Sequence, residues 1–250
     1  MIRIATETDF PSVCDNELLV RIIGLKRADG LEAPFIRYYS DENGALLSLM
    51  DDCGVLYTPQ SPSDEWIAFL SMNPDIRYLH CSAECGLILM DKSEWDGKVG
   101  EVLDFRGHIP ATSPDVCESP DLLSVHELLS HNFDGMSSLN AWYPDVSHRI
   151  RHNCSRIACV LDNNKVVSTA ITVSETEDAC VLGQIATDPH HRRKGLAAKC
   201  IQSLIYRCNG KRLYILPMNE NARNLYIKLG FAPCGGWAEL KKRGGTVFYE

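Results

Sequence analysis

Short runs of hydrophobic residues, separated by turn-forming residues, dominate the first part of the chain. Residues 35–39 and 44–50 are two such runs on either side of the turn sequence Asp-Glu-Asn-Gly, and residues 54–57 are a third. Runs of this length around Asn-Gly turns are typical of antiparallel strands that follow one another in sequence. A helix capped by Ser63 and a strand at 76–81 follow. This part is therefore predicted to be a small α/β domain.

In the second part of the chain, the spacing of the hydrophobic residues alternates several times between the period of a helix and the period of a strand. The spacing of its hydrophobic residues predicts, in order, a helix capped by Ser119 that runs to Leu129, a helix at 146–150, strands at 156–161, 165–173 and 179–187, a helix at 195–206, a strand at 211–216, and a helix at 222–229 that ends at Gly230. A strand, a helix and a further strand in succession are typical of a right-handed crossover. The prediction for this part is a mixed sheet.

Between these two parts, residues 107–120 have no hydrophobic period and are rich in Pro, Ser, Thr and Asp. Such a composition is typical of a linker. A chain of 250 residues is long enough for two small domains. We therefore expect one domain at 1–110 and a second at 111–250.

Charge and cysteine content limit the function and the location. A formal net charge of −8 argues against a protein that coats nucleic acid, because such a protein needs a surplus of Lys and Arg. The eleven cysteines are irregularly spaced and no apolar signal sequence precedes them, so we expect reduced thiols in the cytoplasm. His80, Cys81 and Cys85 lack a second Cys/His pair at zinc-site spacing, which favours core thiols over a metal site. No apolar run approaches the ~20 residues that cross a membrane.

One stretch after the predicted strand at 179–187 has the residues of an anion site. Arg192, Arg193 and Lys194 carry positive charge, and the small residues Gly195 and Ala197 follow at the start of the next predicted helix. The N-terminus of a helix exposes backbone N–H groups, so a phosphate can bind there where no large side chain blocks it. The alternative is a solvated basic turn that begins a surface helix.

A second motif, on the last predicted helix, makes the first one more specific. Arg192, Gly195 and Ala197 fit the pattern Arg/Gln-x-x-Gly-x-Gly/Ala. The pattern Asn-x-x-Ala-x-x-Leu-Tyr-x-x-x-Gly-Phe is matched by Asn219, Ala222, Leu225, Tyr226, Gly230 and Phe231. With both motifs in this order, residues 121–250 resemble the GNAT superfamily of acyltransferases, in which the first motif binds a pyrophosphate.

The resemblance implies a fold, a cofactor and a set of binding residues. The fold would be α/β, of the α+β kind, with a mixed and mostly antiparallel sheet flanked by helices and preceded by the smaller α/β domain. The cofactor would be acetyl-coenzyme A, bound in a cleft where the strand at 181–187 bulges away from its neighbour. The residues implied in cofactor binding are Ile185, Ala186, Thr187, Arg192, Arg193, Lys194, Gly195, Leu196, Ala197, Ala198, Asn219 and Tyr226.

Two of these residues are also implied in catalysis. A backbone N–H at Ala186 would polarise the thioester carbonyl, and Tyr226 would give a proton to the departing thiolate. The alternative for Tyr226 is an aromatic ring that packs under the sheet. The general base is not identified, because Gly183 stands where family members often carry Glu and Gln184 cannot accept a proton at neutral pH. Other candidates for the base are Glu175, Glu177 and His131.

The resemblance predicts an N-acetyltransferase in which an amine of a small molecule or peptide attacks acetyl-coenzyme A directly in a ternary complex. A cysteine nucleophile is not expected, since Cys200, the nearest to Gly195, would point toward the sheet. The alternatives are a catalytically weak or inactive acyl-coenzyme A-binding module and a phosphate-binding protein of another family.

The first domain has two interpretations. Its order of elements favours a degenerate copy of the same fold that has lost the phosphate loop, and the alternative is an unrelated α/β domain. Neither nucleic acid nor a membrane is an expected partner, and a homo-oligomer stays open.

Overall fold

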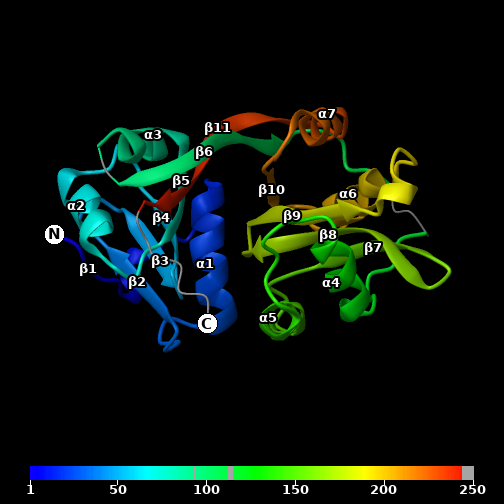
Figure 1. Ribbon diagram of the computed structural model, residues 1–250, viewed down its shortest axis with the longest axis horizontal. Coiled ribbons are helices and arrows are strands. Elements are labelled where there is room, and N and C mark those ends of the chain that lie inside the picture. The colour runs from blue at the N-terminus through cyan, green and yellow to red at the C-terminus, as the bar shows by residue number, and fades with distance from the viewer. Residues whose placement is uncertain (93, 112–114, 244–250) are drawn as a thin grey trace. The chain divides into compact units, whose positions relative to one another are not determined.

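The computed structural model describes residues 1–92, 94–111 and 115–243 (Figure 1). Contacts divide it into two compact units, one of Met1–Val102 with the chain from Pro233 onward, and one of Leu103–Ala232. The chain thus leaves the first unit after Val102 and returns to it at Pro233, whereas the sequence suggests a single boundary at 110/111. Residues 112–114 of the predicted linker lie outside the described residues. In the part of the chain that the structure describes, no helix is long and apolar enough to cross a membrane.

The first unit combines a sheet with α-helices and the short 3-10 helix η1 (Glu7–Asp9). Its elements are β1 (Arg3–Ile4), α1 (Glu17–Asp29), β2 (Ile36–Ser40), β3 (Leu46–Met50), β4 (Cys53–Tyr57), α2 (Asp64–Met72), β5 (Tyr78–Ser82), α3 (Ala83–Lys92), the larger part of β6 (Trp95–Phe105) and most of β11 (Phe231–Lys242). Strands β1 to β4 pair antiparallel, β4 and β5 pair parallel, and β5 pairs antiparallel with β11. The predicted meander is confirmed, although β3 begins at Leu46 and not at residue 44.

Local hydrogen bonds explain two predicted features of this unit. The Asp41 carboxylate accepts hydrogen bonds from the backbone N–H groups of Asn43 and Ala45, both at 2.9 Å, and so fixes the turn between β2 and β3. Ser63 Oγ accepts a hydrogen bond from the N–H of Trp66 at 3.3 Å and caps α2, as its position in the sequence predicts.

The second unit contains a five-stranded arrangement with helices on both faces. Its elements are α4 (Leu122–Ser130), α5 (Leu139–Arg151), β7 (Ile157–Asp162), β8 (Lys165–Glu175), β9 (Ala179–Thr187), the short 3-10 helix η2 (Pro189–His191), α6 (Leu196–Arg207), β10 (Arg212–Ile215) and α7 (Glu220–Lys228). The strand order is β6-β10-β9-β8-β7, and only the pair β9–β10 is parallel. This mixed, mostly antiparallel sheet confirms the predicted fold class.

One helix start differs from the prediction. The N-cap of α4 is Asp121, whose carboxylate accepts hydrogen bonds from the N–H groups of Leu123 and Ser124, and not Ser119. Both residue types cap helices well, so the sequence alone could not separate them.

The two faces of this sheet carry separate hydrophobic cores, and Figure 1 shows α4 and α6 on opposite sides of it. Cys200, Ile201 and Leu204 of α6 pack with Cys180 and Leu182 of β9 on one face. The residues that form the core of the other face are Val125, Leu128, Leu129, Trp142, Val146, Ile157, Cys159, Val166, Ile171 and Ala186. Alternate residues of β7 and β9 thus serve different helices, as strand geometry requires.

The two units share one order of elements. Three antiparallel strands are followed by a helix, a strand parallel to the third, a helix and a long strand: β2-β3-β4-α2-β5-α3-β6 in the first unit, and β7-β8-β9-α6-β10-α7-β11 from β7 onward. The shared order supports the prediction that the first unit is a degenerate copy of the second.

Candidate cofactor and active site

Strand β9 extends beyond the end of its pairing with β10. The last paired residues are Leu182 and Ile215, so the segment from Gly183 to Thr187 continues along β8 alone. A sheet that loses a partner strand in this way leaves one edge of β9 open to a ligand. The predicted splay of this strand thus has a counterpart in the observed pairing.

A β-bulge lies at the start of this open segment. Thr169 pairs with Ala186 and Ile171 pairs with Gly183, so two residues of β9, Gln184 and Ile185, face the single residue between them on β8. Gln184 has a φ of +48°, in the left-handed region that residues other than glycine rarely adopt.

The bulge changes the face of the sheet to which the following side chains of β9 point. Cys180 and Leu182 point to the α6 face, and without the bulge Ala186 would follow them there. Instead Ile185 packs on the α6 side and Ala186 lies in the core under α4 and α5. The extra residue therefore sets the orientation of the backbone at 185–187.

The loop from η2 to α6 has the backbone of an anion site. Arg193 and Gly195 both have left-handed φ values, +61° and +76°, which turn successive N–H groups in the manner of an anion-binding nest. Gly195 is the N-cap of α6, and no described side chain caps this helix start. A Cβ placed on Gly195 would meet no atom within 4 Å, so the approach to the N–H groups is open.

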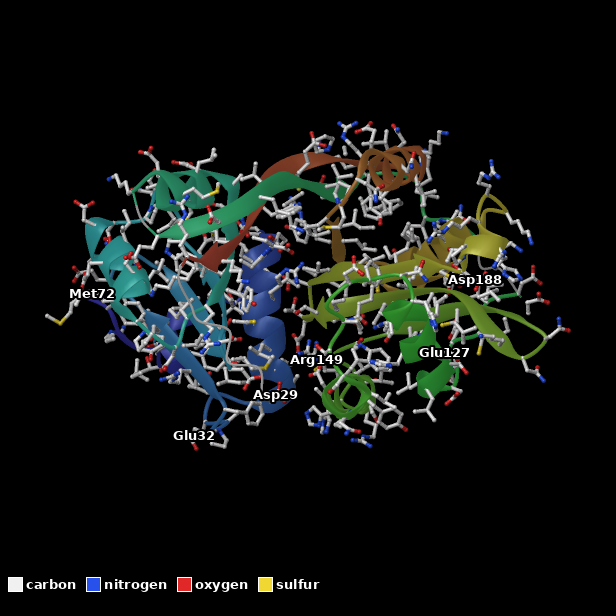
Figure 2. All side chains as sticks on the ribbon, viewed as in Figure 1. Asp29, Glu32, Met72, Glu127, Arg149 and Asp188 are labelled. Atoms are coloured by element: carbon white, nitrogen blue, oxygen red, sulfur yellow. The ribbon has the colours of Figure 1, made fainter. Side chains whose placement is uncertain are left out.

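His191 holds this loop between two carboxylates. Its Nδ1 lies 3.0 Å from Asp188 Oδ1, and its Nε2 lies 3.0 Å from Asp162 Oδ2, in the turn between β7 and β8. Figure 2 shows Asp188 beside η2, after the end of β9. The hydrogen bond to Asp188, followed by that to Asp162, raises the pKa of His191. Both ring nitrogens face acceptors, which is the arrangement of an imidazolium.

Arg192 is also tied to the protein. Its Nε donates to the carbonyl oxygen of Thr187 at 3.2 Å, and a terminal nitrogen donates to Asn132 Oδ1 at 2.8 Å. These bonds connect the loop to the end of β9 and to the turn that follows α4. Part of the donor capacity of Arg192 is therefore used to position the loop.

These elements surround a cavity of about 520 Å³ in the second unit. Its lining residues are Ile185, Ala186, Thr187, His191, Arg192, Arg193, Gly195, Leu196, Ala197, Ala198, Asn221, Ala222, Leu225 and Tyr226. Ten of the twelve residues that the resemblance implies in cofactor binding thus line one cavity. The other two, Lys194 and Asn219, do not line it. Asn219 instead caps α7, because its Oδ1 accepts a hydrogen bond from the N–H of Ala222 at 2.9 Å.

Four lining residues are outside the set implied in cofactor binding: the motif residues Ala222 and Leu225, and also His191 and Asn221, which no motif contained. Its two carboxylate partners, Asp188 and Asp162, could have identified His191, but Asp162 is far from it in sequence. Asn221 lies next to the motif residue Ala222 and was hidden among its polar neighbours.

Tyr226 lines the cavity and is largely buried. Its side chain is 6% exposed, and burial raises the pKa of its phenol to about 12. The ring packs at a centroid distance of 6.3 Å from Phe231. The phenol therefore keeps its proton at neutral pH, as a proton donor must.

A side chain at Gly183, next to the bulge, would be crowded by β8. A Cβ on Gly183 would lie 2.9 Å from Cγ1 of Val173, which is too close for a side chain unless Val173 moves. Glu175 is fully buried and pairs with Arg156 and Lys211, at 2.9 and 2.8 Å. None of the other base candidates, Glu175, Glu177 and His131, is among the residues that line the cavity.

Three cysteines near the site are buried. Cys180, Cys200 and Cys208 belong to the core between the sheet and α6, and none of them lines the cavity. Burial raises the pKa of Cys200 to about 11, which disfavours the nucleophilic thiolate.

Residues 157–238, which contain most of the cavity wall, match the family model described as GNAT acetyltransferase. Solved structures with a similar fold include a GCN5-related N-acetyltransferase from Kribbella flavida, with a TM-score of 0.61 and 15% identity over 90% of this chain and 97% of that one. A Drosophila protein has a TM-score of 0.66 and 13% identity over 96% and 98%. A tandem GNAT protein from the clavulanic acid biosynthesis pathway has a TM-score of 0.55 and 12% identity over 92% and 89%. At these identities the likeness establishes the fold, and no curated protein matches the sequence.

Proposed function

We propose that the chain binds acetyl-coenzyme A in the cavity of its second unit and transfers the acetyl group to an amine, as the match of residues 157–238 to the GNAT acetyltransferase model suggests. One observation carries the proposal: the open edge of β9, the uncapped start of α6 and the Tyr226 side chain share a single cavity. A thioester with a long diphosphate arm needs these three features together.

The residues of the cavity fit the cofactor. The pyrophosphate would bind the N–H groups at the start of α6, where Gly195 leaves the backbone open and Arg193 adds positive charge. Lys194 does not line the cavity, but it lies between Arg193 and Gly195 in the same loop and would add a further positive charge. The pantetheine arm would pair with the free edge of β9 at Ile185 to Thr187, as a short extra strand does.

The reaction would be direct transfer. The neutral amine attacks the thioester carbonyl, and a backbone N–H at Ala186 stabilises the negative charge on the oxygen of the tetrahedral intermediate. The carbon–sulfur bond then breaks, and the phenol of Tyr226 gives its proton to the departing thiolate of coenzyme A. The proton that the amine loses goes to water, and the phenolate recovers a proton from solvent.

The steric exclusion of a carboxylate at Gly183 supports a second candidate. Without a base, the domain would bind acyl-coenzyme A and transfer the acyl group slowly or not at all. Such a module would use the same cavity for sensing or assembly.

One experiment separates the two candidates. The purified protein is incubated with acetyl-coenzyme A and a panel of amines, amino acids and peptides, while free thiol is measured. Acceptor-dependent thiol release supports the transferase. Tight binding of coenzyme A by calorimetry, without release for any acceptor at any pH up to 9.5 or so, supports the binding module.

A further inference from the structure

Helix α5 contacts both irregular positions in the strand pair β8–β9. Trp142 Nε1 donates a hydrogen bond to Gln184 Oε1 at 3.1 Å, and an Arg149 terminal nitrogen donates to the carbonyl oxygen of Val173 at 2.9 Å. Trp142 and Arg149 are two helical turns apart and so lie on the same face of α5. Figure 2 labels Arg149 on this helix.

Both contacts are made to residues at the register shifts, which have no paired residue on the neighbouring strand of β8–β9. Thr172 pairs with Leu182 and Ser174 pairs with Val181, so Val173 is an extra residue of β8 without a direct partner on β9. Its carbonyl oxygen binds Arg149 instead. Arg149 is fixed in turn by Asp145, one turn earlier on α5, at 2.8 Å.

The hydrogen bond from Trp142 restrains Gln184, whose backbone conformation is unfavourable. Its φ of +48° costs free energy for any residue with a Cβ, and such a conformation persists only where its surroundings determine it. The indole of Trp142 is itself held firmly, because the side chain is 4% exposed and packs against the ring of His126 at a centroid distance of 5.3 Å. His126 Nε2 lies 2.9 Å from the carbonyl oxygen of Ser137, at the start of α5.

We propose that Trp142 is a positioning residue for acyl transfer, which acts by holding Gln184 in the bulge that directs the backbone of residues 185 and 186 toward the thioester. This inference rests on the proposed function. The bulge reverses the alternation of side chains along β9, so its loss would turn Ile185 away from the cavity and point the Ala186 N–H elsewhere. Trp142 itself does not line the cavity.

The test uses the full-length protein and two substitutions that break the bond from either side. Trp142→Phe keeps an aromatic ring and removes the N–H donor, while Gln184→Gly removes the acceptor and allows the left-handed φ. A displaced backbone donor affects the transition state more than the bound cofactor. We therefore expect each variant to lower kcat by about 10- to 100-fold, with the Kd for coenzyme A changed by no more than roughly twofold. The double variant should be no slower than the slower single variant.

A matched control is available in the first unit. Trp66 is also buried, and its Nε1 donates to Asp41 Oδ2 at 2.9 Å. Trp66→Phe should lower the melting temperature without a change in kcat. Unchanged kcat in Trp142→Phe, additive losses in the double variant, or an equal loss in the control would overturn the proposal.

A second measurement does not depend on turnover. Amide hydrogen exchange of the peptide that covers residues 183–187 should be faster in Trp142→Phe than in the wild type, and unchanged in Trp66→Phe. If the wild type acetylates no acceptor, the proposed function fails. The exchange rates still decide whether Trp142 holds the bulge, and unchanged exchange in Trp142→Phe would refute that.

Discussion

The side chain of Val173 occupies the space that a side chain at Gly183 would need, with its Cγ1 2.9 Å from the position of a Cβ there. Val173 is the extra residue of β8, and Gly183 stands at the edge of the bulge in β9. A larger side chain at residue 183, including the carboxylate expected there from the resemblance, would therefore fit only if Val173 moved. This relationship leads to the first prediction.

Gly183→Glu should destabilise the protein by about 1–3 kcal/mol through overpacking. Val173→Ala in the same chain should remove most of this loss, because it deletes both methyl groups of Val173.

The wild-type rate should follow the neutral fraction of the amine and rise about tenfold per pH unit below the pKa of the amine. In the double variant the new carboxylate should flatten that rise. Chemical denaturation and a pH–rate profile measure the two effects; a double variant as unstable as Gly183→Glu alone would contradict the steric explanation.

Tyr226→Phe should reduce kcat by about 10²–10⁴-fold, the usual contribution of a positioned proton donor. The ring and its packing on Phe231 remain, so the affinity for coenzyme A should stay nearly constant. The pKa of about 12 further predicts that the wild type shows no loss of rate from phenol ionisation below about pH 11. Equal turnover in the Phe variant would assign Tyr226 to packing alone.

Substitutions at Gly195 should act through the backbone and not through a clash. The φ of +76° is strained for a β-branched residue, and a Cβ meets nothing within 4 Å. Gly195→Val should therefore weaken coenzyme A binding by about 1–3 kcal/mol, measured by calorimetry. Gly195→Asn, which tolerates this conformation, should weaken it much less. Equal losses for both variants would show that side-chain size matters more than φ.

His191 should make the stability of the loop between β9 and α6 depend on pH. Its pKa in the folded protein is raised by Asp188 and Asp162, so the stabilisation is complete below its ordinary value of about 6.5 and is lost as the pH rises through the raised pKa. The melting temperature should fall more between pH 6 and pH 9 or so in the wild type than in His191→Asn. Asp162→Asn should reduce the dependence in part. An identical pH dependence in the wild type and His191→Asn would rule out this linkage.

Transfer should proceed without an acyl-enzyme. The described thiols nearest to the site are buried, and the pKa of Cys200 is raised to about 11, so neither access nor ionisation favours attack on the thioester. Initial rates with both substrates varied should give intersecting lines, and mass spectrometry after exposure to acetyl-coenzyme A alone should detect no adduct. A stoichiometric adduct on one cysteine that an amine discharges would overturn direct transfer.

The long-range parts of the first unit were not predicted from the sequence. Helix α1 at Glu17–Asp29 was missed, although Leu18, Leu19, Val20 and Ile22 are buried there. A helix with apolar residues on several sides has no clear helical period, since it is buried by neighbours that the sequence does not name. Strands β6 and β11 were missed for a related reason: their outer parts are polar, and they are strands because other strands pair with them.

What the sequence determined by itself is local. The cap at Ser63, the left-handed glycine at 230 and the order of elements from β7 to α7 follow from contacts between residues close in the chain. The tertiary structure alone decided that His191 meets Asp162, that Val173 excludes a side chain at residue 183, and that Trp142 reaches Gln184. These contacts depend on strand register and on the bulges that shift it, and register is set by the burial of whole faces of the sheet and not by any short stretch of residues.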